Sequence, residues 1–186
     1  LIRSIAASFG REKDFKLFSL SFPNESCSYN PIKVGSPLQQ KDKLLSGLEL
    51  SHEYYGSKAD EFLGAIFDAC HYLGRPMDLS ALHQILINKN EFSNLTKSLH
   101  EFPESDVTLK LINQMSSVRQ INDKDLSGLI AQIGSLNSLE LMSLLTKKTS
   151  KPELDLVEVL QNNQIAYFQL NVNAYQKIAK KLGKLI

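Results

Sequence analysis

The sequence predicts a mainly α-helical protein, a helical bundle that lies between two β-strands of the chain. Apolar residues recur at helical spacing through most of residues 37–163. Two short segments, 15–20 and 165–170, have instead the apolar and aromatic composition of strands. We therefore expect a bundle of about six to eight helices. Because an insertion leaves and re-enters its host at nearby points, we also expect the two strands to pair or to lie side by side.

Capping signals mark where the expected helices begin and end. Ser36 is placed to cap a helix, Pro37 to take its first position and Gln39 to complete a capping box. The most amphipathic segment, 55–73, ends at Gly74. These local signals predict two successive helices with well-defined ends.

The remaining helices are predicted from caps, breaks and apolar spacing. Asp78, Asn90 and Asn122 are the expected caps, and Val107 and Leu109 are among the residues expected to face the core. The predicted helices in chain order are 1–9, 37–52, 55–73, 79–86, 90–102, 105–118, 122–136 and a last one from about 174. A further short turn is expected at 139–145, and a short helix or turn at 153–160.

The composition is that of an ordinary globular protein. The chain has 186 residues, 42% of them hydrophobic and 22% charged, with a formal net charge of +1. These values exclude wholesale disorder and give no overall attraction to nucleic acid. The longest apolar runs are far shorter than the ~20 residues of a membrane span, and the N-terminus does not resemble a signal peptide. We expect Cys70 in the core, Cys27 exposed in a loop, and a reducing, cytoplasmic setting.

No motif in the sequence indicates catalysis. The chain has no phosphate-binding glycine-rich loop, and its four histidines show no metal-ligand spacing. The adjacent carboxylates of Asp60 and Glu61 fit a solvated helix face better than an acid–base pair. We therefore expect no catalytic residue, no cofactor and no metal ion in this chain.

Two clusters of lysines are candidate contacts for DNA or for a partner. Four recur at i, i+3, i+4 and i+7 on the last helix, and a second group lies in a polar break before residue 152. The candidate residues are Lys177, Lys180, Lys181, Lys184, Lys147 and Lys148. Four lysines on one face can contact phosphates without base specificity. A plain solvated helix face is the other interpretation, and it is the favoured one.

The two ends of the chain carry more specific motifs. A Ser-x-x-Tyr-Asn-Pro sequence (Ser26, Tyr29, Asn30 and Pro31) follows the first strand, and a Tyr-Phe-x-Leu strand is followed by Leu-Gly-Lys-Leu-Ile over 182–186. With these motifs the chain resembles the TraG/TraD class of type IV coupling proteins, ATPases that feed DNA or protein into conjugation and type IV secretion machines. The similarity covers both ends and the first helices of the insert. It departs from the family at Phe22, where relatives often have histidine.

The resemblance implies a division of the chain into three parts. Segments 1–36 and 164–186 would be remnants of an FtsK/HerA-like nucleotide-binding α/β motor domain, and 37–163 the family's all-alpha domain. The parent would be a hexameric ATPase anchored in the bacterial inner membrane, with its Walker motifs, ATP and Mg²⁺ outside this chain. Coupling between motor and insert would run through 20–36 and 161–175.

The resemblance also implies a function and two alternative partners. The all-alpha domain would recognise secreted protein substrates or adaptors on the cytoplasmic side of the membrane. In the alternative, it would be a DNA-binding cap that contacts transfer DNA or the relaxosome. In both cases we expect the chain by itself to be a monomer and not an enzyme.

Overall fold

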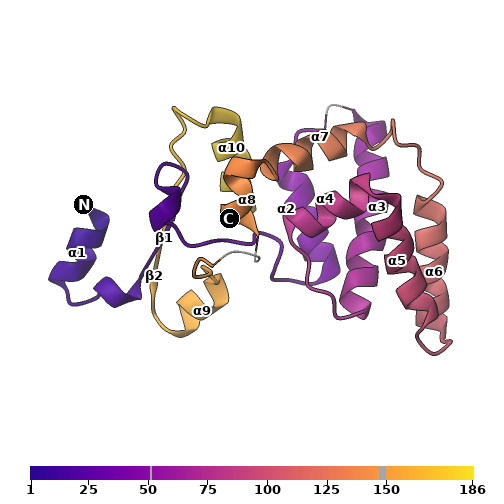
Figure 1. The fold of residues 1–186 in the computed structure, drawn as a ribbon, viewed down its shortest axis with the longest axis horizontal. Coiled ribbons are helices and arrows are strands. Elements are labelled where there is room, and N and C mark those ends of the chain that lie inside the picture. Colours follow the sequence, from indigo (N-terminus) through magenta and orange to yellow (C-terminus); the bar gives the residue numbers. More distant parts are fainter. Residues whose placement is uncertain (51, 147–149) are drawn as a thin grey trace.

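The two predicted strands lie side by side and pair in parallel (Figure 1). β1 (Phe15–Ser19) and β2 (Ile165–Gln169) are in register, with Phe15 opposite Ile165 and Ser19 opposite Gln169. Parallel strands need a long crossover connection, and here that connection contains every helix from α2 to α9. The computed structural model describes residues 1–50, 52–146 and 150–186. Within them, the predictions of a mainly helical chain and of two adjacent strands are confirmed.

Helices account for most of the described residues. In chain order they are α1 (Ile2–Ser8), α2 (Pro37–Gly47), α3 (Glu53–Tyr72), α4 (Leu79–Ile87), α5 (Lys89–His100), α6 (Asp106–Val118), α7 (Ser127–Leu136), α8 (Leu139–Leu145), α9 (Leu156–Gln161) and α10 (Gln176–Leu185). Short 3-10 turns at Glu12–Asp14 and Pro23–Glu25 flank β1.

Two of the predicted helix starts are confirmed in atomic detail. The Ser36 hydroxyl accepts the Gln39 amide at 3.3 Å, and the Gln39 side chain accepts the Ser36 amide at 2.9 Å, which completes the capping box of α2. The Asp78 carboxylate accepts the Ala81 amide at 2.8 Å at the start of α4. Gly74 follows α3 with a positive φ of 63°, a conformation that favours glycine at a helix end.

Three helix boundaries were predicted wrongly. Asn88, not Asn90, caps α5, since its side-chain oxygen accepts the Asn90 amide at 3.0 Å. Asn122 does not cap α7, because its side chain accepts the Lys124 amide in a turn and the helix begins only at Ser127. The helix from Pro37 ends at Gly47 rather than at His52, because the backbone becomes extended at Leu48 (φ −95°, ψ 142°).

The two cysteines are both free and both buried. Cys70 was predicted in the core and is 3% exposed. Cys27 was predicted to be exposed, and this is wrong, because it is only 7% exposed. The chain after β1 turns back along that strand, and the Cys27 amide donates to the Leu17 carbonyl at 2.7 Å. A sequence-local loop therefore becomes part of the core.

The buried face of α6 is narrower than predicted. Leu111 and Met115 are buried, but Val107 and Leu109 are 54% and 43% exposed. The helix packs with one side against α3 and α5 at an end of the bundle (Figure 1). Its other side therefore remains in solvent, where two apolar residues cost little.

One hydrophobic core extends through both the strands and the helices. The cluster of buried residues runs from Phe18 in β1, through most of the helices, to Leu182 and Leu185 in α10. The last helix packs closely on α2, where Gly47 faces Leu185. The predicted domain boundaries stay a prediction, and the residues assigned to the C-terminal remnant are packed directly on the predicted all-alpha domain.

In the part of the chain that the structure describes, no single helix is both long and apolar enough to cross a membrane. Helices α7 and α8 satisfy that criterion only when taken together, and they meet at an angle of 76°.

Candidate functional site

The lysines of α10 do not form one exposed face. Lys181 is 9% exposed, and its ammonium group donates to the Ser135 hydroxyl in α7 at 2.9 Å. Burial lowers the pKa of Lys181. Lys177, Lys180 and Lys184 are exposed. The prediction of a four-lysine face is therefore wrong at Lys181, which turns toward α7 because that side of the helix packs on the bundle.

The second lysine cluster contributes little to a basic surface among the described residues. Lys147 and Lys148 lie outside the described residues. The neighbouring Lys151 is partly buried, and its ammonium group donates to the Pro23 carbonyl. Among the candidate lysines that the structure describes, DNA phosphates therefore meet three exposed lysines on α10 rather than a basic patch that joins the two clusters.

Tyr29 joins the strands to the helices. Its ring packs edge-on against Phe18 of β1 and Phe168 of β2, with centroid distances of 6.0 and 5.2 Å. Its amide donates to the Leu144 carbonyl in α8 at 2.7 Å, and its hydroxyl donates to the Leu185 carbonyl in α10 at 3.3 Å. One buried residue thus contacts β1, which precedes it closely in the sequence, and also α8, β2 and α10, which lie far along the chain.

Asn30 extends this junction to the connection between α3 and α4. Its side-chain amide donates to the Met77 carbonyl at 2.8 Å, and its side-chain oxygen accepts the Ile32 amide at 3.1 Å. Ser26 begins the motif, and its hydroxyl accepts the Ser19 amide of β1 at 2.9 Å. The polar side chains of the Ser-x-x-Tyr-Asn-Pro motif are therefore used within the fold. We define residues 26–31 as the junction.

A lysine and two carboxylates hold the outgoing chain beside the returning chain. The Lys33 ammonium lies 2.7 Å from Asp155 and 3.0 Å from Glu153, and all three side chains are at most about one-third exposed. The hydrogen bond from Lys33 lowers the pKa of Asp155, which also caps α9 through two backbone amides. Ser28 pairs with the same returning segment through backbone hydrogen bonds of 2.9 and 2.7 Å.

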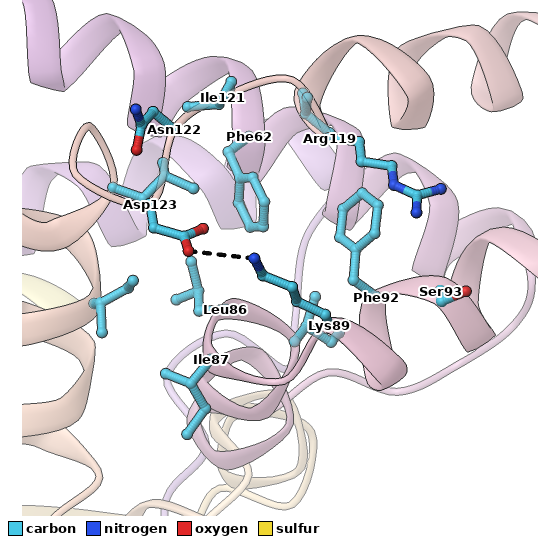
Figure 2. A pocket seen from close by; sticks show the side chains of 14 residues that line it. Phe62, Leu86, Ile87, Lys89, Phe92, Ser93, Arg119, Ile121, Asn122 and Asp123 are labelled. Carbon is cyan, nitrogen blue, oxygen red and sulfur yellow. Dashed lines mark ion pairs between the residues drawn. The ribbon is translucent and has the colours of Figure 1, made fainter.

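A cleft of about 650 Å³ lies among the helices (Figure 2). The helices α3, α4, α5 and α6, which contribute to it, lie far from β1 and β2 (Figure 1). The cleft is formed by α3, α4, α5, the end of α6, the start of α7 and the turn that connects these last two. Its apolar lining consists of Phe62, Ile85, Leu86, Ile87, Phe92, Val118, Ile121, Leu126 and Ile130. Its polar lining consists of Lys89, Ser93, Arg119, Asn122 and Asp123.

The charged groups of the cleft lie at its edge. Lys89 and Asp123 face each other at 3.5 Å, with 88% and 77% of their side chains exposed (Figure 2). An ion pair so exposed contributes little to stability and can exchange partners readily. Arg119 is also exposed, and among the described residues its guanidinium has neither an ion pair nor a hydrogen bond. The cleft therefore combines an apolar floor with a guanidinium group, that of Arg119, which can bind an anionic group of a partner.

The sequence did not indicate this cleft. Its lining residues come from several segments between residues 62 and 130, and no two of these segments share a motif. One weak signal was present, since Ile87 continues the apolar pattern of α4 to the helix end, where it is 51% exposed. A groove made by helix ends depends on how the helices cross, which periodicity alone does not encode.

The described residues hold no group of three or more histidines, cysteines and carboxylates placed to bind a metal ion. The carboxylates that could suggest acid–base chemistry form surface ion pairs: Asp60 lies 2.7 Å from Lys41, and Glu61 lies 3.0 Å from Lys58. His83 lies in contact with Asn137, with 3.2 Å between their nitrogens. The predictions that the chain has no catalytic residue and needs no cofactor stay predictions.

The chain was compared with known proteins in two ways. A scan against protein-family models gave no match, and a search of curated proteins gave no match either.

Proposed function

We propose that this chain is the recognition domain of a type IV secretion or conjugation coupling protein. In this proposal it engages secreted protein substrates or their adaptors at the cytoplasmic entrance of an ATPase motor. One observation supports it most: β1 and β2, which adjoin or carry the resembling motifs, pair in parallel while the helices α2 to α9 occupy the connection between them. This is the arrangement expected when a helical recognition unit is carried between neighbouring strands of a motor sheet.

The junction would connect binding to the motor. Tyr29 and Asn30 join β1 and β2 to α8, α10 and the connection between α3 and α4. A displacement of the strands would therefore have to move these helices or break buried hydrogen bonds, and breaking them costs free energy. In the proposal, the motion of the strands that accompanies ATP hydrolysis in the parent would be transmitted through these contacts to the helices that bind the cargo.

A protein partner is favoured over DNA for two reasons. The net charge of +1 gives no general attraction to a polyanion, and Lys181 is withdrawn from the basic face of α10. The cleft, in contrast, offers partly exposed apolar side chains, which is typical of a surface that binds protein.

We expect the helical part to contact exported proteins in living cells. A photo-crosslinking amino acid would be placed, one position at a time, at Tyr54, Ile87, Leu109 and Leu160 of the parent protein, all of which are exposed here. At least one position should form a covalent adduct with a protein that is itself found outside the cell. Adducts with DNA alone, or none with an exported protein at any position, would refute the proposal.

We expect the lysines of α10 to give no DNA binding at near-physiological salt. Fluorescence anisotropy of labelled single- and double-stranded DNA would compare the wild-type chain with Lys180→Gln/Lys184→Gln. The matched control is Lys97→Gln/Lys110→Gln, on exposed faces of α5 and α6. Binding that weakens steeply with salt, and is lost in the α10 variant but not in the control, would support the DNA-binding cap instead.

A further inference from the structure

We infer that the cleft binds an amphipathic helix of a protein partner, one that presents apolar side chains to the floor and an acidic side chain to Arg119. This inference rests on the proposed function and names the kind of segment that would be recognised. Its occupant is a partner helix rather than a small molecule, nucleic acid or a second copy of this chain.

The distribution of polar groups favours a helix over a small polar ligand. A small-molecule site has a few polar groups that converge inside the pocket. Here the charged and amide side chains of Lys89, Arg119, Asn122 and Asp123 are exposed at the edge, and the interior is lined by aliphatic and aromatic groups. An apolar floor with a polar rim is the anatomy of a groove that accepts the apolar face of a helix.

The available apolar side chains come from both sides of the cleft. Ile87 ends α4 and is half exposed, while Phe92 of α5 and Ile121 of the α6–α7 connection are partly buried. Phe62 of α3 closes the floor behind them and packs on Phe92, with 6.0 Å between ring centroids (Figure 2). Side chains spaced at i, i+3, i+4 and i+7 on a partner helix can occupy such a groove along its length.

The rim charges specify an acidic partner. The lining of the cleft carries two cations, Lys89 and Arg119, and one anion, Asp123, and the ion pair between Lys89 and Asp123 is long and exposed. Arg119 therefore has all of its donors available, and a guanidinium binds a carboxylate in a two-fold hydrogen-bonded geometry. A glutamate or aspartate beside the apolar stripe of the partner can pair with Arg119, whose guanidinium points away from the Lys89–Asp123 ion pair (Figure 2).

The test selects peptides on the intact 186-residue chain. The probe is a phage-displayed library of random peptides of roughly 16 residues, about four helical turns. Selected sequences are then synthesised and titrated by fluorescence anisotropy. The variants are Arg119→Glu and Ile87→Asp in the cleft, and Leu109→Asp on the outer face of α6 as the control. All three residues are exposed, so these substitutions should leave the fold intact.

We expect the selected peptides to combine helical apolar spacing with an acidic residue. Arg119→Glu should weaken their binding by roughly tenfold, the effect of losing one interfacial charge pair, and Ile87→Asp should abolish it. Leu109→Asp should bind as the wild type does. A peptide with lysine in place of its acidic residue should bind poorly to the wild type and better to Arg119→Glu, which a merely structural role of Arg119 would not produce.

Several outcomes would overturn the inference. Selection of no peptide, of peptides without acidic residues, or of peptides indifferent to Arg119→Glu would each do so. A dimer in analytical ultracentrifugation that Ile87→Asp dissociates would identify a second copy as the occupant. If exported proteins crosslink at other positions while the peptides fail, the cleft inference falls and the proposed function stands. If no exported protein crosslinks anywhere, the proposed function falls as well.

Discussion

Replacing Tyr29 with alanine is expected to lower the free energy of unfolding by about 3–5 kcal/mol, the cost typical of removing a buried aromatic ring. Tyr29 is 4% exposed and packs between Phe18 and Phe168, so its loss leaves a cavity between the strands and the helices. Urea denaturation at neutral pH measures the change. Tyr54→Ala is the control: Tyr54 is 56% exposed, and its loss should cost less than about 1 kcal/mol. Equal losses of stability for the two variants would contradict the burial of the Tyr29 ring between the strands and the helices.

Tyr29→Phe separates the hydroxyl from the ring. The variant keeps the ring packing but leaves the Leu185 carbonyl without its donor, which should cost about 1 kcal/mol near neutral pH. Burial raises the pKa of Tyr29 to about 12, whereas the unfolded chain titrates near pH 10. Above pH 10 the unfolded chain therefore loses this proton while the folded chain keeps it, and stability falls as the pH rises toward 12.

The consequence is a pH-dependent difference between the two proteins. The stability advantage of the wild type over Tyr29→Phe should be full below pH 9 and should shrink by roughly 1 kcal/mol between pH 9 and pH 11. Denaturant unfolding of both proteins at each pH isolates this residue, because the lysines and other tyrosines titrate alike in the two. A difference that does not change with pH would mean that the Tyr29 hydroxyl is in contact with water.

Replacing Gly47 with alanine is expected to lower the free energy of unfolding by about 1–3 kcal/mol through overpacking. An added Cβ would lie 2.7 Å from Cδ2 of Leu185 and 2.8 Å from its Cγ, closer than carbon atoms approach without displacement. Leu185 is fully buried and cannot swing away, so α10 must move from α2. Denaturant unfolding measures the loss of stability. In hydrogen exchange, the substitution should reduce the protection of α10, relative to the wild type, more than that of α3.

Gly64→Ala is the matched control for this substitution. Gly64 lies inside α3, and an added Cβ there would meet only Cδ of Lys41, at 3.8 Å, an ordinary contact. Alanine forms helices more readily than glycine, so the free energy of unfolding of this variant should rise by up to about 1 kcal/mol. If Gly47→Ala lowers the free energy of unfolding and Gly64→Ala raises it, the loss at Gly47 is due to the contact between α2 and α10. A neutral or stabilising Gly47→Ala would mean that α10 is not held against α2 as described.

These two sites share a structural consequence. Tyr29 and Leu185 are joined by a hydrogen bond, and Leu185 is the residue that packs on Gly47. The junction, α10 and α2 therefore form one continuous set of contacts between the strands and the helical bundle. In the proposed function, a substitution at either site would weaken coupling between motor and cargo even where the cleft itself is unchanged.

Local sequence signals were sufficient for much of the secondary structure. The capping box from Ser36 to Gln39 and the cap at Asp78 were predicted correctly, because a cap involves residues within three positions of one another. The strands were found for the same reason, as each is a short run with its own composition. The predicted caps at Asn90 and Asn122 were wrong for related reasons. Asn88, two residues earlier, caps α5, and the Asn122 side chain accepts a backbone amide within a turn instead of capping a helix.

What the amino-acid order alone settled is thus the kind of most elements and their approximate place along the chain. The lysine spacing of α10 identified a helix, but only the packing of α10 on the bundle decided that Lys181 is buried and bonded to Ser135 of α7. The same holds for Cys27, which the folding back of the chain after β1 places in the core. The cleft brings together Phe62 and Ile130, residues whose proximity depends on helix crossing angles. Such contacts arise from the packing of many side chains at once, so only the tertiary structure could define them.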